Sequence, residues 1–180
     1  MQKTFFISDM HFGHKRILTY EDRPFNDLNE MTEVLIKNWN KKIKKEYTVF
    51  VLGDVSFYGK DKTTEIINRL NGRKYLILGN HDTGHSLKYW KEVGFEHVSK
   101  YPILFDNWFI LSHEPRYEIA DKGLYYNIHG HLHSHGSAYQ PEIFYNVCIE
   151  RNNYSPVDFE DIKIKLYMGK TIQIESSMLI

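Results

Sequence analysis

A chain of 180 residues is long enough for one well-cored domain and short for two, so we expect residues 1–180 to form a single domain. Hydrophobic residues make up 42% and charged residues 26%, a composition that excludes a disordered chain. Because 23 basic residues balance 23 acidic ones, the composition also argues against a long polyanion held by bulk charge, and any nucleic-acid role would have to be local.

Strand and helix patterns alternate in the first half of the chain. Short apolar runs predict strands over residues 3–8, 47–52 and 74–78, and apolar residues at helical spacing predict helices over residues 27–42, 61–70 and 86–93. Asn26 or Asp27 is expected to cap the first of these helices. A helical turn is expected over residues 14–20, before Pro24.

Strands dominate the second half. Residues 95–98, 101–105 and 108–111 predict successive antiparallel strands with Asp106-Asn107 as a hairpin turn, and residues 124–128 and 143–149 predict two more. A final helix is expected to be capped by Ser155, to begin at Pro156 and to end at Gly169, and residues 171–180 fit either a strand or a loose tail. The two halves together predict an α/β fold in layers, with a mixed sheet core and helices outside.

Asp, Asn and His residues follow five of the expected strands. They occur as Asp9-x-His11, Gly53-Asp54, Gly79-Asn80-His81-Asp82, Ser112-His113 and Gly130-His131-x-His133. Because ligands in layered α/β folds gather beyond the carboxyl ends of strands, we expect these side chains to meet. Mixed oxygen and nitrogen donors suit Mn, Fe, Zn or Ni and are too rich in nitrogen for a calcium or magnesium cage. Seven of the nine Asp, Asn and His side chains in these blocks, all but His81 and Asp82, are candidate ligands. Seven are too many for one tetrahedral site and suit two metal ions that share an aspartate.

His81 and Asp82 are the two block residues that are not counted as metal ligands. Two metal ions roughly 3.5–4 Å apart bind a phosphoryl group and generate a bridging hydroxide nucleophile. His81 is not needed to complete either metal shell, so it is free to stabilise or protonate a leaving oxygen. Asp82 is a candidate for orienting His81.

These five blocks, in this order, resemble those of the calcineurin-like metallophosphoesterase superfamily, and they span residues 9–133. The resemblance implies a sandwich of two mixed β-sheets flanked by helices, with the site along one sheet edge. It implies Asp54 as the residue that bridges the metals and His81 as the histidine that contacts the substrate phosphate. The other implied ligands are Asp9, His11 and His133 for one metal, and Asn80, His113 and His131 for the other. Residues 9–14 with 23–25, and residues 146–150 with 154–157, further resemble a compact bacterial and phage subgroup of phosphoesterases.

The expected function is therefore a dinuclear metal-dependent phosphoesterase in which a metal-bridging hydroxide attacks phosphorus. The expected cofactors are two divalent transition-metal ions, with manganese favoured and iron, zinc or nickel as alternatives. Little of the chain is spare for a lid, so small phosphodiesters or nucleotides, including cyclic ones, are the favoured substrates. The alternatives are a phosphomonoesterase, a dinucleoside polyphosphate hydrolase or a nuclease on the same fold, and a non-catalytic metal-binding scaffold for protein partners.

Three further expectations concern single residues and the compartment. Arg23 is expected to bind a substrate phosphate through its planar guanidinium, with an ion pair to a nearby Asp or Glu as the alternative. His14, His129 and His135 are near predicted ligands and could hold an imidazole in place, or could be exposed turn residues. The single cysteine, Cys148, is expected to be a small buried hydrophobe and fits a reducing compartment. With no signal-peptide pattern and no membrane-spanning run, a cytoplasmic location is expected.

Overall fold

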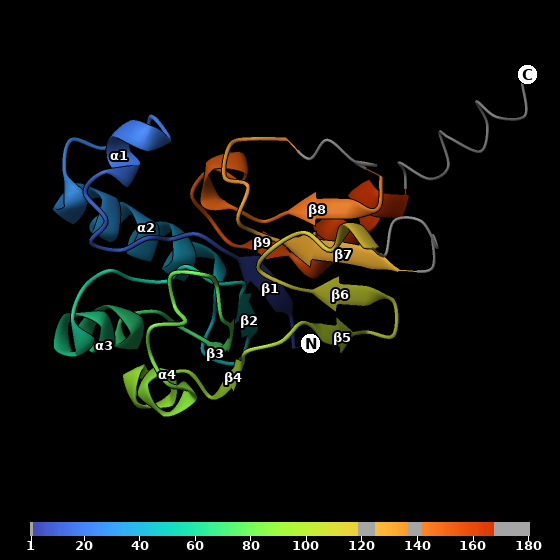
Figure 1. The fold of residues 1–180 in the computed structure, drawn as a ribbon, viewed down its shortest axis with the longest axis horizontal. Coiled ribbons are helices and arrows are strands. Elements are labelled where there is room, and N and C mark those ends of the chain that lie inside the picture. Colours follow the sequence, from blue (N-terminus) through green and yellow to red (C-terminus); the bar gives the residue numbers. More distant parts are fainter. Residues whose placement is uncertain (1, 119–124, 137–141, 168–180) are drawn as a thin grey trace, which may run out of the picture.

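Two β-sheets pack against each other, with most of the helices on one side (Figure 1). The computed structural model describes residues 2–118, 125–136 and 142–167. The first sheet has the strand order β4-β3-β2-β1-β9, with β1 (Thr4–Ile7), β2 (Thr48–Val51), β3 (Arg73–Ile77), β4 (His97–Ser99) and β9 (Val157–Asp158). The second has the order β5-β6-β7-β8, with β5 (Ile103–Phe105), β6 (Phe109–Leu111), β7 (Tyr126–His129) and β8 (Phe144–Asn146). The predicted α/β sandwich of two mixed sheets is confirmed.

Strand direction brings the polar strand ends together. In the first sheet β1, β2, β3 and β4 are parallel neighbours, and only β9 pairs antiparallel, with β1. In the second sheet β6, β7 and β8 are parallel. The backbone N–H of Ser8, just after β1, donates to the Val147 carbonyl just after β8 at 3.2 Å, which joins the ends of the two sheets. Parallel strands end at the same edge, so the loops after β1, β2, β3, β6 and β7 are neighbours.

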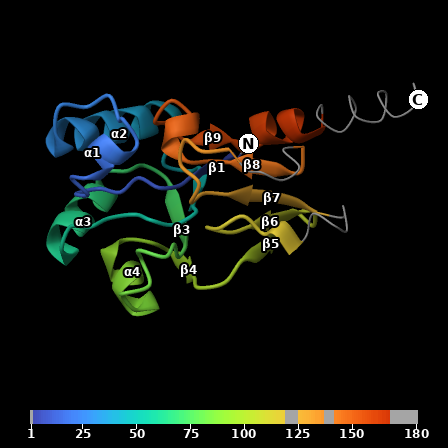
Figure 2. The ribbon, with the colours of Figure 1, turned by 45° about the horizontal axis from the view of Figure 1, so that its top comes forward.

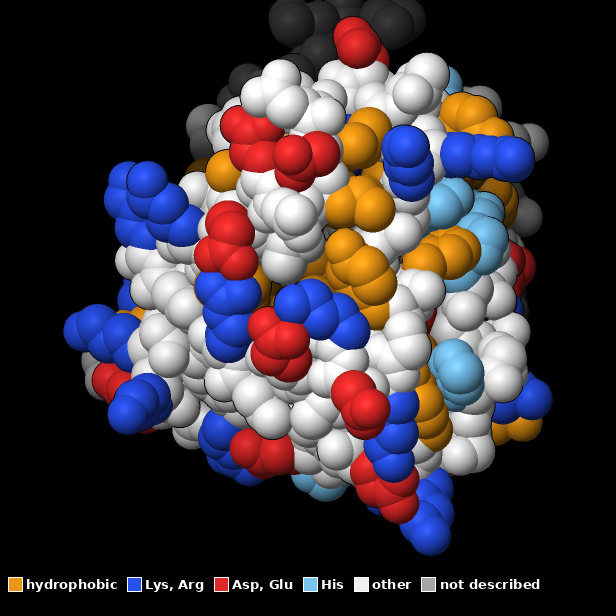
Figure 3. Space-filling view, turned by 90° about the vertical axis from the view of Figure 1, so that its left-hand side faces the viewer, with side chains coloured by type: hydrophobic (Ala, Val, Ile, Leu, Met, Phe, Trp, Pro, Cys, Tyr) orange, Lys and Arg blue, Asp and Glu red, His pale blue; other side chains and the backbone are white. Residues whose placement is uncertain are grey.

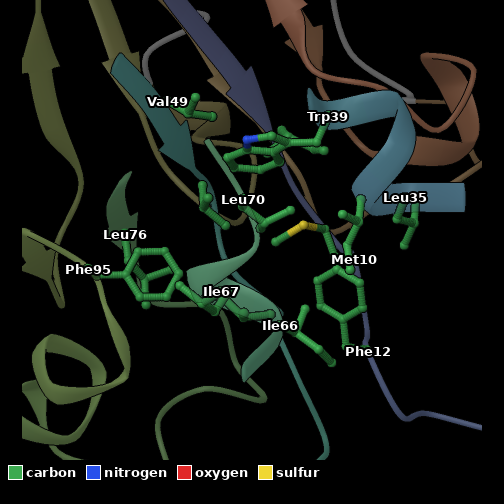
Figure 4. Packing of buried hydrophobic residues seen from close by; sticks show 14 of the residues in the cluster. Met10, Phe12, Leu35, Trp39, Val49, Ile66, Ile67, Leu70, Leu76 and Phe95 are labelled. Carbon is green, nitrogen blue, oxygen red and sulfur yellow. The ribbon is translucent and has the colours of Figure 1, made fainter. Parts of the chain in front are cut away.

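Helices cover the outer face of the first sheet (Figures 1 and 2). They are α1 (Ile17–Tyr20), α2 (Leu28–Lys42), α3 (Lys60–Asn68) and α4 (Leu87–Val93). The Asp27 side chain accepts the backbone N–H groups of Asn29 and Glu30, which confirms Asp27 as the cap of α2. Figure 4 shows Trp39 of α2 and Ile67 of α3 pointing into the cluster that contains Leu76 of β3. Burial of these side chains holds the helices against the first sheet, and the loops that carry the polar residues emerge from the edge of that sheet.

A second cluster of aromatic side chains fills the space between the sheets. The rings of Phe6 and Phe50 stack with centroids 5.5 Å apart, and Phe105 from the second sheet meets Phe6 edge-on at 5.7 Å. A helix over residues 159–167 adds Phe159 and Ile162 to this cluster. Aromatic side chains therefore form much of the contact between the two sheets.

Some predicted elements differ from the observed ones. The segment 95–98 yields β4, which pairs parallel with β3 in the first sheet, so only β5 and β6 form the expected antiparallel hairpin. Asp106 and Asn107 have φ angles of 49° and 62°, which confirms the predicted turn. The last helix begins at residue 159 and not at Pro156, because β9 first pairs with β1. The predicted strand 143–149 ends at Asn146.

Several expectations stay predictions. Leu124, Gly169 and residues 171–180 lie outside the described residues. The single-domain assignment of residues 1–180 is likewise untested. Within the described ranges, no helix combines the length and apolar character needed to cross a bilayer.

Candidate metal centre

Most of the predicted ligands have a strained backbone. Five of the seven have φ angles from 48° to 69°, and these are Asp9, His11, Asp54, His131 and His133. For residues other than glycine, this left-handed conformation costs about 1–2 kcal/mol each. The strain lies in the loops after β1, β2 and β7. Backbone strain concentrates at functional sites, so these loops are the part of the fold to examine for chemistry.

The first ligand group consists of Asp9, His11 and His133. The Nε2 atoms of His11 and His133 each lie 3.7 Å from Asp9 Oδ1. Asp9 Oδ2 accepts the backbone N–H of His131 at 2.9 Å and the thiol of Cys148 at 3.1 Å, so Oδ1 is left facing the imidazoles. Asp9 Oδ1 and both ring nitrogens of His11 are buried and have no hydrogen-bond partner within the described residues. A cation would satisfy Asp9 Oδ1 together with His11 Nε2, the ring nitrogen that faces the carboxylates.

The second ligand group consists of Asn80, His113 and His131. The Leu52 carbonyl oxygen accepts from His113 Nδ1 at 2.7 Å, so His113 Nε2 is free to present a lone pair. That Nε2 lies 2.9 Å from Asn80 Oδ1 and 3.2 Å from His131 Nδ1, which is itself 3.1 Å from Asn80 Oδ1. One amide oxygen and two imidazole nitrogens therefore converge, an arrangement that a cation or a proton between them would stabilise.

Asp54 lies between the two ligand groups. Its Oδ2 atom is 3.5 Å from His11 Nε2 and 3.5 Å from His113 Nε2. Its other oxygen, Oδ1, accepts the backbone N–H of His81 at 3.0 Å, which holds the carboxylate in this orientation. One oxygen therefore faces both groups, a position from which it could be shared by two cations.

The electrostatics of the cluster also favour bound positive charge. Burial alone would raise the pKa of Asp9, but His11, His113 and His133 hold that pKa well below its usual range. Burial lowers the pKa of His113, yet the neighbouring carboxylates of Asp54 and Asp9 outweigh it and raise that pKa to about 9. The carboxylates thus attract a proton where a metal ion would bind in its place. The mixture of carboxylate, amide and imidazole donors fits divalent metal ions.

His81 lies at the open side of this cluster, next to an exposed aromatic ring. Its side chain is 47% exposed, with Nε2 4.0 Å from Asp54 Oδ2. The Phe57 ring is 43% exposed, with its centroid 5.0 Å from that of His81 and 4.2 Å from that of His14, on which it stacks. Figure 3 shows histidine and hydrophobic side chains side by side at the surface. His81 is thus accessible to a substrate, and Phe57 borders the same opening.

A cleft borders the other side of the cluster. It has a volume of about 310 Å³ and is lined by Asn80 and His113, with Lys100, Pro102 and Arg116 among its other walls. This volume suits a small organic group. The site is therefore flanked on two sides, by Phe57 and by this cleft.

Asp82 has a different role from the expected one of orienting His81. Its carboxylate accepts the backbone N–H groups of Asp54 and Gly79, each at 2.8 Å, and of Val55 at 3.0 Å. Burial raises the pKa of Asp82 to about 6, while these N–H groups act to lower it. Asp82 therefore ties the loop after β2 to the loop after β3.

Arg23 lies where it cannot meet the expectation of a substrate contact. Its side chain is fully buried, and its donors bind the carboxylate of Glu150 and the carbonyl oxygens of Asp9 and Met10. The alternative of an ion pair is the one observed. The signal for Arg23 in the sequence was its charge, which does not distinguish a buried pair from a substrate contact. Glu150, its partner, ends the segment 146–150 of the subgroup resemblance, but no local pattern links it to a residue 127 positions away.

The remaining histidines and the cysteine occupy varied positions. His14 Nδ1 is buried, and His14 packs against Phe57. His129 is buried and its Nδ1 bonds to the Gly130 carbonyl at 2.8 Å, while His135 is largely exposed, 3.9 Å from Glu21. Cys148 is buried as expected, and the contact of its thiol with Asp9 is an addition that its apolar sequence context did not indicate.

Comparisons with other proteins agree with this geometry. The profile of the calcineurin-like phosphoesterase family matches residues 3–166. An uncharacterized protein of Methanocaldococcus jannaschii is 32% identical over 187 residues, covering 96% of each chain. The gene 66 protein of Mycobacterium phage L5 is 34% identical over 167 residues, covering 74% of this chain and 79% of the phage protein. The crystal structure of a protein of unknown function from Aquifex aeolicus matches with a TM-score of 0.72 at 28% identity, covering 91% of this chain and 98% of that one. With nearly its whole length matched, the chain belongs to the calcineurin-like phosphoesterase family, a family of metal-dependent phosphoesterases.

Proposed function

We propose that the chain is a dinuclear metal-dependent phosphodiesterase that hydrolyses small phosphodiesters or nucleotides, including cyclic nucleotides. The observation that carries the proposal is the position of Asp54 Oδ2, 3.5 Å from an imidazole nitrogen of each ligand group. The first and second ligand groups would each hold one divalent ion, with Asp54 shared. Both groups mix oxygen and nitrogen donors, which suits manganese and equally iron, zinc or nickel, and we take manganese as the first ion to test.

The residues of the chain divide the chemistry among them. Bound divalent ions would supply positive charge for the phosphoryl oxygens and would lower the pKa of a bound water. The two ligand groups fix where a phosphoryl group can bind, since Asp54 and its neighbours are buried and their orientations are set by backbone hydrogen bonds. His81, half-exposed at the open side, donates a hydrogen bond to a phosphoryl oxygen or to the leaving oxygen.

The two flanks of the site support a diester over a monoester. A diester carries an organic group on each of two ester oxygens, whereas a monoester carries one. Phe57 offers an apolar face beside His81, and the cleft of about 310 Å³ lies beside the second ligand group. Two flanks for two small substituents therefore favour small diesters.

The direct test compares bis-p-nitrophenyl phosphate with p-nitrophenyl phosphate, with Mn²⁺ added and then with a chelator. We expect metal-dependent turnover that favours the diester, and we expect His81→Ala to lower kcat on the order of 10²-fold or more. A preference for the monoester would assign a phosphomonoesterase. Turnover confined to dinucleoside polyphosphates or to nucleic-acid ends would select those hydrolases, and a lack of turnover with every metal would favour a binding scaffold.

Phe57 provides a second test of the diester assignment. Phe57→Ala removes the exposed ring beside His81, and we expect the KM for bis-p-nitrophenyl phosphate to rise about fivefold, from the loss of about 1 kcal/mol of ring contact. The KM for the monoester should change less. Trp108→Ala is the matched control, because Trp108 is also an exposed aromatic residue but precedes β6, whereas the site loop follows that strand. Equal KM values for wild type and Phe57→Ala on the diester would show that this ring does not contact substrate.

A further inference from the structure

A buried ion pair lies behind the first ligand group. The Nε and Nη2 atoms of Arg23 donate to Glu150 Oε1 at 3.0 and 2.6 Å. The side chains of Arg23 and Glu150 are 0% and 4% exposed. Removing two charges from water costs about as much as their attraction returns, so a buried pair of this kind is a weak source of stability. Its position in the fold indicates a different role.

Arg23 also holds the loop that follows β1. Its Nη2 donates to the Asp9 carbonyl at 2.8 Å and its Nη1 donates to the Met10 carbonyl at 3.0 Å. In this loop Asp9 and His11 have φ angles of 60° and 50°. The N–H groups of Asp9 and His11 also donate to the Gly53 and Asp54 carbonyls, so Arg23 holds the carbonyl side of a strained segment whose N–H side is held by the loop after β2. Arg23 therefore helps to fix the direction in which Asp9 and His11 are presented.

Glu150 holds the third member of the same group. Its Oε1 atom accepts from His133 Nδ1 at 3.0 Å. With the proton on Nδ1, His133 Nε2 presents its lone pair toward Asp9 Oδ1, 3.7 Å away. One carboxylate oxygen thus receives both Arg23 and His133. The Arg23–Glu150 pair therefore touches or positions every residue of the first ligand group.

The second ligand group is held by other contacts. His113 Nδ1 bonds to the Leu52 backbone carbonyl, and Asp82 joins the loops that carry Asp54 and Asn80. None of these contacts, among those of the described residues, involves Arg23 or Glu150. The two halves do touch, since the His131 backbone N–H donates to Asp9 Oδ2 and the His11 backbone N–H donates to the Asp54 carbonyl. Among the described residues, however, the side-chain hydrogen bonds of Arg23 and Glu150 reach, of the two ligand groups, only the first and its loop.

We propose that Arg23 and Glu150 are positioning residues that set the metal affinity of the first ligand group without setting that of the second. The proposal rests on the proposed dinuclear function. It assigns a selective role to two residues that lie outside the five polar blocks. Substitution in this pair should lower the binding affinity for one ion on the order of 10–100-fold and leave the affinity for the other ion as in the wild type.

The test is a Mn²⁺ titration of metal-free protein. Calorimetry measures the affinity and number of bound ions, and electron paramagnetic resonance reports whether two ions are coupled. The wild type should bind two ions and give the signal of a coupled pair. Glu150→Gln keeps the shape of the side chain and removes its charge, so one ion should bind normally and the second 10–100-fold more weakly. At two equivalents of Mn²⁺ its spectrum should be that of isolated ions. Glu33→Gln is the matched control, since Glu33 pairs with Arg69 through two hydrogen bonds at the surface.

A double-mutant cycle assigns the weakened site. Glu150→Gln should add less than its full effect to that of His133→Ala, because the two residues share a contact in the first ligand group, and should add fully to that of His131→Ala. Arg23→Lys keeps the charge but loses the forked geometry, so it repeats the test if Glu150→Gln fails to fold. If the affinities for both ions fall equally, or if neither changes, the inference is wrong but the proposed dinuclear function is unaffected. A wild type that binds fewer than two ions would overturn both.

Discussion

Replacing Asp54 with asparagine is expected to lower phosphodiester turnover at least about 10³-fold, a loss of about 4 kcal/mol of transition-state stabilisation. Asp54 Oδ1 accepts the backbone N–H of His81, so an asparagine keeps its oxygen there and places its NH₂ group where Oδ2 lies. That NH₂ group would face His11 and His113, each 3.5 Å from the present Oδ2. An amide nitrogen has no lone pair to offer a cation, so the shared ligand is lost while the side-chain size is kept.

The measurement is kcat on bis-p-nitrophenyl phosphate over a range of Mn²⁺ concentrations, with Mn²⁺ stoichiometry determined on the same sample. Asp61→Asn is the control, because it makes the same chemical change in the exposed first turn of α3. We expect the control to match the wild type. An Asp54→Asn enzyme that binds two ions and retains more than a tenth of wild-type kcat would remove Asp54 from the proposed shared position.

The sequence predicted the part of the fold that short-range patterns control. The apolar runs that become β1, β2 and β3 are each followed by polar residues, and alternation with helices indicated parallel strands. Parallel strands end at one edge, so the convergence of the polar blocks could be predicted before any coordinates. The same reasoning failed for residues 95–98, because a short apolar run does not indicate which strand it pairs with. It failed at Pro156 because the pairing of β9 with β1 overrode local helix signals.

The supporting residues of the site were harder to predict. Arg23 and Glu150 are charged, and charged residues are rarely fully buried, so an exposed or substrate-binding role was the natural expectation for Arg23. Only the fold brings the two together across 127 positions. Asp82 shows the same limit, since its neighbour in sequence is His81 but its carboxylate contacts the backbone of Asp54, Val55 and Gly79. Patterns indicate which side chains can bind metal, and tertiary contacts decide which residues hold them in place.

Gly79→Ala is expected to lower the free energy of unfolding by roughly 3 kcal/mol, which corresponds to a fall in Tm of about 10 °C, and to abolish paired metal binding. A Cβ atom on Gly79 would lie 2.2 Å from Asp54 Oδ1 and 2.6 Å from the Asp54 backbone nitrogen. The side-chain oxygen could rotate away, but that movement would displace the carboxylate proposed to be shared by both ions. The backbone nitrogen can move only if the loops after β2 and β3 separate, which would break the contacts of Asp82.

Gly84→Ala is the matched control for this close approach. Gly84 lies five residues further along the same loop, and a Cβ atom there would meet nothing within 4 Å. The same added methyl group should therefore leave Tm and metal stoichiometry unchanged. Thermal unfolding with and without Mn²⁺ separates the two effects, because a purely structural change would lower both Tm values equally, whereas loss of the metal site removes the stabilisation that Mn²⁺ adds. If Gly79→Ala has the Tm of the wild type and still gains stability from Mn²⁺, then the loops after β2 and β3 can accommodate the added methyl group. That result would contradict the close contact between Gly79 and Asp54.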